Sequence, residues 1–418
     1  MTKITLSQLA NHPSCMDDYD PNAMSVTQAR TFVQQFLTPV AQTECSPIRE
    51  SLHRILAENI VSPQHVPNHN NSAMDGYAFK YSEGIKMIKI IGTAFAGRPF
   101  DGEVKPSECV KIMTGAVIPK GTDTVIMQEK TVNKGDYINV LEDAPTKGSN
   151  VRLAGEDLKR GEIVLCKGHQ IQAADLGLLA SLGIADVMVN RQLKVAFFST
   201  GDELVSLGKP LEEGQIYDSN RYTIYGMLSE LKVLITDLGV VPDQPALLEA
   251  TLLKAAGAHD VVLTSGGVSV GEADYMKSLL RKHGEVLFWK INMKPGRPLA
   301  YGKVRNAHYF GLPGNPVSTM VTFYQFVRQA LLTLMGNNVL PSPVFQVECT
   351  ESIKKAKGRT EFQRGTLFEE NGVWKVKPLA NQGSGILSSM SQANCFIVLD
   401  EDTGHCNPGA IVKVQIYK

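Results

Sequence analysis

The segment KVAFFSTGDEL, residues 194–204, is an apolar run that ends in a turn with two carboxylates, and DVVLTSGGVSVGEADY, residues 260–275, repeats that arrangement with glycines and serines. Around both segments, short apolar runs alternate with longer stretches that have helical spacing. Strands separated by helices in this way favour right-handed βαβ crossovers and a parallel sheet. Residues 191–338 are therefore predicted to form an α/β domain. The predicted strands are 194–200, 232–241, 260–267 and 285–291, and the predicted helices are 222–231, 245–258, 275–284 and 317–335.

The flanking regions have different patterns of apolar and polar residues, so we expect a multidomain protein of α/β plus β class. Residues 26–62 are expected to be helical, with Ser25 ahead of the first apolar stripe. Short strands divided by Gly and Pro clusters follow over 66–147, and helix then strand over 173–189. Residues 339–418 have the short alternating strands of a small β-barrel or sandwich.

Composition excludes several classes of protein. The 418 residues contain 42 Lys plus Arg and 42 Asp plus Glu, and this zero net charge argues against a nucleic-acid-binding protein. The seven cysteines include no C-x-x-C pair, which argues against a disulfide framework or a zinc site and favours a reducing compartment. Without a signal core or a membrane span, the protein is expected in the cytoplasm.

Ligands of open α/β sheets bind beyond the carboxyl ends of the strands, so the turns there hold the first candidates. After the first strand, Asp202 and Glu203 follow Gly201, and a helix N-cap with an acidic first turn explains them equally well. After the third, Ser265, Gly266, Gly267 and Ser269 favour phosphate binding by backbone N–H groups and hydroxyls, and Asp274 comes next. A plain glycine turn is the alternative.

Two further turns combine prolines with cations or glycines. In KINMKPGRPLAYG (290–302), Lys290, Lys294 and Arg297 lie around Pro295 and Gly296, either as a rigid cationic site or as a basic surface turn. In GLPGNPVS (311–318), Pro313, Gly314 and Asn315 precede a helix that Asn315 or Ser318 could cap. Asp243 stands at a possible N-cap position, and hairpin turns explain Asp75 and Thr114 as well as a site does.

Taken together, these turns resemble the molybdopterin molybdenumtransferase family. The resemblance covers nearly the whole chain and is carried by NNSAMDGYA, IMTGA, RLAGEDL, STGDEL, QIYDSN, TSGGVSVGEADY, FWKINMKPGRP, GLPGNPVS, GRTEFQRG and QGSGIL, in that order. It implies a homodimer whose subunit has an elongated helical dimerisation domain (1–65 and 148–190), a β-rich insertion (66–147), a molybdopterin-binding α/β domain (191–338) and a C-terminal β-barrel (339–418).

The resemblance also implies an activity, the last step of molybdenum cofactor synthesis. Such enzymes take adenylylated molybdopterin, cleave its phosphoanhydride with a divalent cation, here Mg²⁺, insert molybdate and release AMP. The pterin-adenylating enzyme that supplies the substrate and the downstream molybdoenzymes are the protein partners implied.

Roles follow from the resemblance by motif. Glu203, Asp243 and Asp274 would hold the metal or orient the pyrophosphate, and Lys290 and Lys294 would neutralise molybdate and the developing phosphate charge. Asp75 and Thr114 would enter the cleft from the partner subunit. Substrate would be bound by Ser265, Gly266, Gly267, Ser269, Pro295, Gly296, Arg297, Pro313, Gly314, Asn315, Arg364 and Ser384.

Two other functions remain open. The α/β domain alone also resembles molybdopterin adenylyltransferases, although the β insertion and the barrel argue against that activity. The other function is that of a non-catalytic scaffold of the same fold that binds a partner peptide. What argues against a scaffold is the joint presence of the charged residues Asp75, Asp243, Asp274, Lys290 and Lys294.

Overall fold

The computed structural model describes residues 23–141, 145–267, 275–338 and 342–417. The chain divides into two compact units, one made of Met1–Glu44, His53–Ile55 and Asn190–Lys418, the other of Cys45–Leu52 and Leu56–Val189. We call them unit 1 and unit 2 and describe each by itself. Among the described residues, no helix has the length and apolar character needed to cross a membrane.

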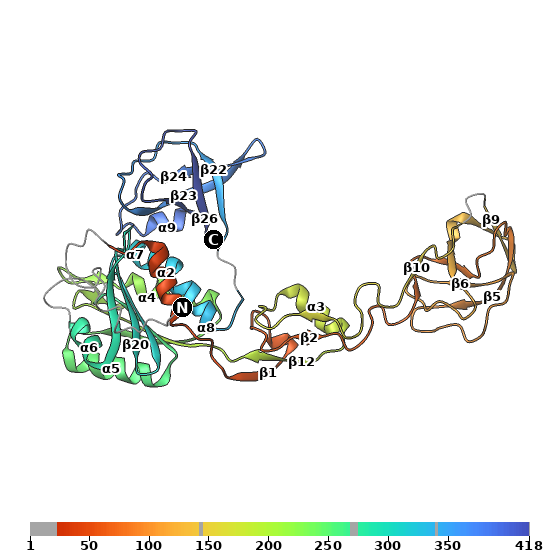
Figure 1. Ribbon diagram of the computed structural model, residues 1–418, viewed down its shortest axis with the longest axis horizontal. Coiled ribbons are helices and arrows are strands. Elements are labelled where there is room, and N and C mark those ends of the chain that lie inside the picture. The colour runs from red at the N-terminus through yellow and green to blue at the C-terminus, as the bar shows by residue number, and fades with distance from the viewer. Residues whose placement is uncertain (1–22, 142–144, 268–274, 339–341, 418) are drawn as a thin grey trace. The chain divides into compact units, whose positions relative to one another are not determined.

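A six-stranded sheet forms the centre of unit 1, in the order β16-β13-β17-β21-β20-β18 (Figure 1). Its strands are β13 (Lys194–Thr200), β16 (Leu234–Val241), β17 (Val261–Ser265), β18 (Gly284–Lys290), β20 (Pro298–Val304) and β21 (Ala307–Leu312). The pairs β16–β13, β13–β17 and β17–β21 are parallel, as the βαβ pattern predicts. At the other edge the sheet is mixed, because β20 runs antiparallel to both of its neighbours.

Helices cover both faces of this sheet. Alternate residues of β13 point to opposite sides: Val195 and Phe197 join the core beside α4, while Ala196 and Phe198 join the core beside α5 and α6. Both cores are buried, which is why the strand has an almost continuous apolar sequence. The helices are α2 (Val26–Gln35), α4 (Ser219–Glu230), α5 (Pro245–Ala258), α6 (Tyr275–His283), α7 (Pro316–Thr322) and α8 (Arg328–Leu334), the last two joined by a π-helical stretch, Phe323–Val327.

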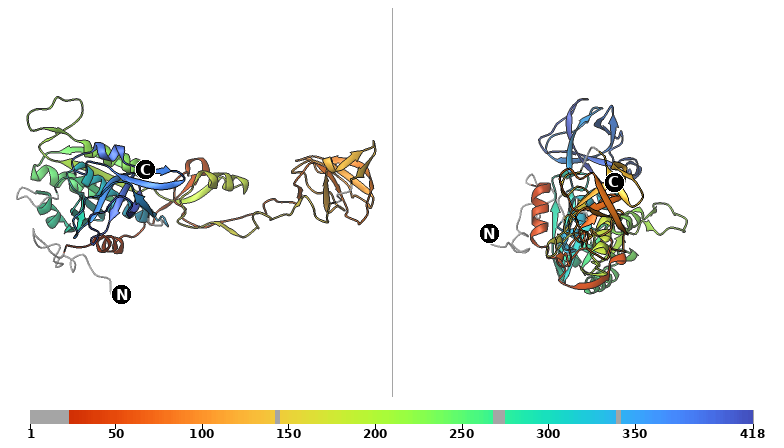
Figure 2. Two further views of the ribbon diagram at one scale, coloured as in Figure 1. Left: turned by 90° about the horizontal axis from the view of Figure 1, so that it is seen from above. Right: turned by 90° about the vertical axis from the view of Figure 1, so that its right-hand side faces the viewer.

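The C-terminal part of unit 1 is a closed five-stranded barrel, as predicted. β23 pairs with both β24 and β25, which closes the order β23-β24-β22-β26-β25, and β19 is added at β23. Figure 2 shows the barrel in blue. Its elements are β19 (Met293–Lys294), β22 (Val344–Cys349), β23 (Thr360–Glu370), β24 (Val373–Pro378), α9 (Ser388–Gln392), β25 (Cys395–Leu399) and β26 (Ile411–Ile416).

Unit 2 contains a second six-stranded sheet, in the order β7-β4-β6-β5-β9-β8, and several two-stranded pairs. Both faces of the sheet are packed, with Ala78 on one side and Tyr77 and Phe79 on the other. Its described elements are β1 (Thr43–Pro47), β2 (Ile60–Val61), β3 (Asn71–Ser72), β4 (Gly76–Phe79), β5 (Met87–Ala94), β6 (Glu108–Ile112), β7 (Thr124–Met127), β8 (Thr131–Asn133), β9 (Tyr137–Val140), β10 (Val151–Arg152), β11 (Ile163–Leu165), α3 (Ala173–Ser181) and β12 (Asp186–Asn190).

The expected helical segment over 26–62 is wrong beyond its first part. Ser25 caps α2 with a capping box, but the helix ends at Gln35. Pro39 and Pro47 interrupt any continuation, and His53 adopts a φ of 67°, outside the helical region. Short strands and a 3₁₀ turn, Ile48–Glu50, occupy the remainder.

Candidate active site

A pocket of about 750 Å³ lies in unit 1 beyond the carboxyl ends of β17 and β21. The turn between β19 and β20 and two segments of the barrel complete its walls. The described residues that line it are Gly266, Gly267, Met293, Lys294, Pro295, Gly296, Arg297, Pro298, Pro313, Gly314, Asn315, Ser318, Arg359, Gln382, Gly383 and Ser384. Three of these are cations and none is a carboxylate, so the pocket is suited to an anionic ligand.

Four of the turns predicted from sequence meet at this pocket. They contribute these predicted residues: Gly266, Gly267, Lys294, Pro295, Gly296, Arg297, Pro313, Gly314, Asn315 and Ser384. Their common location agrees with ligand binding, while the individual role of each remains a prediction.

The turn after β17 packs tightly against the end of β13. Gly266 has a φ of 89°, and a Cβ there would lie 2.6 Å from the carbonyl oxygen of Thr200, so only glycine fits. The N–H of Gly266 donates to the carbonyl of Leu312 at 3.1 Å. Gly266 therefore shapes the pocket wall, but its own N–H is already used within the sheet.

The cationic turn is fixed at both ends, which distinguishes it from a basic surface turn. β19 pairs with the barrel strand β23, and β20 belongs to the central sheet. Lys294 Nζ lies 3.6 Å from Glu361 Oε1, and the Lys294 side chain is 57% exposed. Arg297 Nε is buried and has no hydrogen-bond partner among the residues that the structure describes. The two cations are thus placed at the pocket by the backbone on either side.

Asn315 occupies the N-cap position of α7, yet its side chain makes no capping hydrogen bond. The same side chain lines the pocket, so its amide is available to a ligand. The capping interpretation of Asn315 is therefore wrong.

Carboxylates gather at the neighbouring strand ends instead. Asp243 does not cap α5, since Gln244 is the N-cap; its Oδ1 accepts a hydrogen bond from the Thr200 hydroxyl. Asp202 Oδ1 in turn accepts from the Asp243 N–H at 3.2 Å. No helix follows Asp202, because the chain continues into β14 (Leu204–Val205), which pairs with β15 (Ile216–Tyr217). The acidic N-cap explanation is therefore excluded.

The predicted metal ligands are only partly assembled in the described chain. The exposed Glu203 turns back on its own loop, with Oε2 2.6 Å from where a Cβ of Gly201 would lie. Asp274 lies outside the described residues, as does Ser269, and no group of three His, Cys, Asp or Glu suited to a metal occurs within them. Asp202 and Asp243 still fit Mg²⁺, which commonly binds one or two carboxylates together with substrate phosphates.

Besides Asp75, Thr114, Glu203 and Asp243, three more of the described residues predicted for the site lie outside the lining of the pocket. Lys290 ends β18, opposite the lining residue Pro298. Ser265 is 3% exposed. Arg364 is 1% exposed and donates to Ser389 Oγ and to the Asn381 and Gly383 carbonyls, and burial lowers its pKa to about 10.

These contacts give Arg364 a different position from the one predicted. Its guanidinium holds the backbone of residues 381–383 from behind, where Gln382 and Gly383 line the pocket, and its own donors face away from a ligand. Direct substrate contact by Arg364 is therefore not supported.

Asp75 and Thr114 belong to unit 2, where they contact each other. Asp75 Oδ1 accepts from the Thr114 N–H at 2.7 Å and from its hydroxyl at 2.8 Å. The backbone hydrogen bond, followed by the side-chain one, lowers the pKa of this exposed carboxyl. The next residue, Gly76, must be a glycine because β7 approaches it closely. A Cβ at this position would lie 1.9 Å from the carbonyl oxygen of Ile126. The glycine is structural, and the Asp75–Thr114 pair is presented at the surface.

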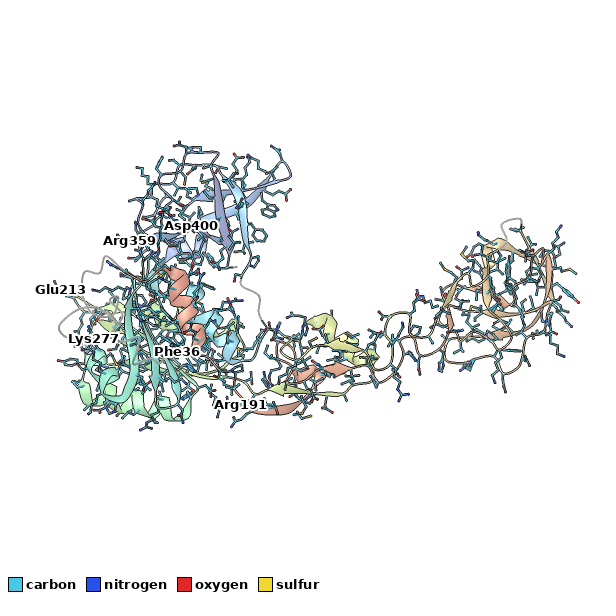
Figure 3. The ribbon with its side chains drawn as sticks, viewed as in Figure 1. Phe36, Arg191, Glu213, Lys277, Arg359 and Asp400 are labelled. Atoms are coloured by element: carbon cyan, nitrogen blue, oxygen red, sulfur yellow. The ribbon has the colours of Figure 1, made fainter. Side chains whose placement is uncertain are left out.

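Sequence reasoning did not select Arg359, Gln382 and Gly383 for the pocket, and of the two neighbouring carboxylates it assigned metal binding to Glu203 and not to Asp202. Arg359 precedes β23, where the barrel meets the rest of unit 1 (Figure 3). The strings GRTEFQRG and QGSGIL contain these three residues of the barrel. Met293, Pro298 and Ser318 also line the pocket without having been assigned a role in ligand binding. Spacing alone could not show which members of those strings face the pocket.

Three family models match the chain. Residues 24–183 match the MoeA N-terminal region (domain I and II), residues 196–333 a probable molybdopterin binding domain, and residues 346–417 the MoeA C-terminal region (domain IV).

Known proteins match along most of the chain as well. A molybdopterin molybdenumtransferase of Haemophilus influenzae is 46% identical, over 94% of this chain and 98% of that protein. Gephyrin of Dictyostelium discoideum is 36% identical over 88% of this chain and 58% of its own length. The crystal structure of a molybdopterin biosynthesis MoeA protein from Pyrococcus horikoshii superposes with a TM-score of 0.83 at 31% identity, covering 94% of this chain and all of that one.

Proposed function

Because the chain belongs to the molybdopterin molybdenumtransferase family, we propose that it transfers molybdenum from molybdate to adenylylated molybdopterin, with cleavage of the phosphoanhydride and release of AMP. The observation that carries this proposal is the pocket at the strand ends, which has three cations and no carboxylate among its described lining residues. A tetrahedral oxyanion and a pterin phosphate are both anions that such a lining would bind.

We assign anion binding and metal binding to two neighbouring places along one edge of the central sheet. Lys294, Arg297 and Arg359 would bind molybdate and phosphate oxygens, and the Asn315 amide and Ser384 hydroxyl would add neutral donors. Asp202 and Asp243 follow β13 and β16, the next two strands from β17. At the usual strand spacing that edge spans about 10 Å, a distance that an extended anhydride can bridge.

Mg²⁺ held by Asp202 and Asp243 would supply charge neutralisation at the anhydride oxygens. Lys294 and Arg297 would stabilise the negative charge that develops as the anhydride breaks, because fixed cations need no reorganisation during the reaction. Arg297 would also bind in a bidentate manner, since guanidinium matches the geometry of an oxyanion.

We further propose that the protein acts as a homodimer in the cytoplasm and that Asp75 and Thr114 of the partner subunit complete each site. The resemblance to the family supports this arrangement. The surface location of the Asp75–Thr114 pair agrees with it, since an exposed pair can be presented to another subunit.

The test is an assay with purified protein, adenylylated molybdopterin and Mg²⁺, with and without molybdate. We expect AMP and molybdenum-bound pterin to appear only when molybdate is present. Formation of the adenylylated species from ATP and free molybdopterin would instead identify an adenylyltransferase. Tight binding of the substrate without turnover would contradict the proposal that the protein is an enzyme and would favour a non-catalytic scaffold.

A further inference from the structure

Asn220, on the first turn of α4, contacts the last residue of β17 and the turn after β21, next to the pocket wall. We propose that Asn220 is a positioning residue that ties the end of β17 to the turn after β21 and so sets the distance between the pocket-lining residues that follow the two strands. The expected effect on catalysis rests on the proposed function, whereas the hydrogen bonds that Asn220 makes do not depend on that proposal.

The Asn220 amide nitrogen donates to two acceptors, one on the last residue of β17 and one on the turn after β21. Nδ2 lies 2.7 Å from the hydroxyl oxygen of Ser265 and 2.6 Å from the carbonyl oxygen of Gly314. Asn220 is 8% exposed and Ser265 3%, so water does not compete for these bonds. One buried side chain therefore joins two segments that are 49 positions apart in the chain, 265 and 314.

Backbone hydrogen bonds between β17 and β21 do not continue beyond the last residue of β21 in the described chain. β17 and β21 pair as far as Ser265 opposite Leu312, and the Gly266 N–H makes a further bond to Leu312. Pro313 comes next and has no N–H to donate. The two turns would separate at this point without a side chain between them, and Gly266, Gly267, Pro313, Gly314 and Asn315 all line the pocket beyond it.

Asn220 is itself held firmly. Asp218, 2% exposed, caps α4 by accepting from the Arg221 N–H, and the Asp218 N–H bonds to the Val205 carbonyl at 3.2 Å. Ile224 and Leu228 on the same helix are fully buried in the core. A side chain anchored in this way can define the position of the segments that it contacts, because its own backbone is fixed by helix and core.

The matched variants are Asn220→Asp, which keeps the size and removes both donors, and Asn394→Asp. Asn394 makes the same type of side-chain-to-backbone contact, with Nδ2 2.9 Å from the Leu367 carbonyl, but it lies in the barrel and does not line the pocket. Asn220→Ala, which removes the donors without adding a charge, serves as a second variant.

We expect Asn220→Asp and Asn220→Ala to speed amide hydrogen exchange about tenfold in residues 264–267 and 311–317, since both variants lose the buried hydrogen bond to the Gly314 carbonyl. The KM for adenylylated molybdopterin should rise about tenfold with kcat changed less than about twofold, the signature of weakened binding that is shared by ground state and transition state. Asn394→Asp should leave both exchange in these segments and KM unchanged.

Unchanged exchange in both Asn220 variants would overturn the proposal, as would an equal rise in KM for Asn394→Asp. A failure of the proposed function gives a different result: the wild-type protein would not release AMP, whereas the exchange measurement would still decide whether Asn220 holds the two turns.

Discussion

Lys294 should contribute little to the stability of the fold but much to the rate of the proposed reaction. Its side chain is largely exposed, and its ion pair with the nearly buried Glu361 is 3.6 Å long. Without Lys294, Glu361 would still accept a hydrogen bond from Gln363 Nε2 at 2.8 Å, so we expect the pair to contribute no more than about 1 kcal/mol to stability. In the pocket, the same ammonium would face the charge that develops on the anhydride. Removing one group that stabilises such charge typically costs a factor of roughly 10²–10³ in rate.

Lys294→Ala should therefore lower kcat/KM by about 10²-fold or more while changing the free energy of unfolding by less than about 1 kcal/mol. Steady-state AMP release and denaturant unfolding measure the two quantities. Lys413→Ala is the control, because Lys413 is also an exposed lysine in an ion pair, 2.6 Å from Asp400, and does not line the pocket. Similar losses of activity in both variants would show that Lys294 has no special role.

The carboxyl of Asp75 gives a prediction about pH. Two hydrogen bonds from Thr114 stabilise its charged form and lower its pKa. Thr114→Val removes the hydroxyl donor and keeps the backbone donor, so Asp75 should take up its proton at a higher pH than in the wild type. Thr114→Ser should leave the pKa near the wild-type value.

A carboxyl-detected NMR titration measures the pKa of Asp75 directly. Identical values in the wild-type and Thr114→Val proteins would contradict the Asp75–Thr114 contact.

At the level of single residues, sequence indicated which turns matter more reliably than which side chains face a ligand. Lys294, Arg297 and Asn315 were predicted and line the pocket. Arg364 came from an equally distinctive string, yet its guanidinium is buried against backbone carbonyls. Burial depends on packing between distant segments, which a motif does not contain.

At the level of elements, the close contact between β4 and β7 allows a stability test in unit 2. Gly76→Ala would place a methyl group 1.9 Å from the Ile126 carbonyl oxygen, so the strands must move apart. We expect a loss of about 3 kcal/mol in the free energy of unfolding, at the upper end for overpacked sites.

Gly177→Ala provides the matched control. Gly177 lies within α3 with open space around its Cα, so the same substitution should stabilise the protein by up to about 1 kcal/mol through helix propensity. Urea unfolding followed by circular dichroism reports both changes. A Gly76→Ala protein as stable as the wild type would contradict the strand pairing.

Elements with regular periodicity were predicted well, and those with prolines or charges were not. The elements β13, α4, β16, α5, β17 and α6 follow their apolar patterns, whereas the two-residue strands β14 and β15 were not predicted. β20 was assigned to a turn because it begins at Pro298 and follows two cations, and the 11-residue β23 lacks a clear alternation. Both strands are fixed by pairing with partners, β21 and β24, that local patterns do not reveal.

At the level of the whole molecule, the proposed sharing of sites between subunits predicts complementation. In a dimer formed from an Asp75→Ala chain and a Lys294→Ala chain, one site would contain both substitutions and the other neither. Random mixing of two inactive variants should therefore restore about a quarter of the wild-type activity. Each variant alone is the control, and no recovery after unfolding and refolding the mixture would rule out a site shared between subunits.

The most direct measurement of the central claim is a single turnover in which molybdate is added to the protein already loaded with adenylylated molybdopterin and Mg²⁺. AMP release and molybdenum-bound pterin would be followed in the same samples. Our account predicts that both products appear with the same dependence on molybdate and reach equal amounts, one of each per substrate consumed. Release of AMP at the same rate without molybdate, with no molybdenum bound to the pterin, would contradict it.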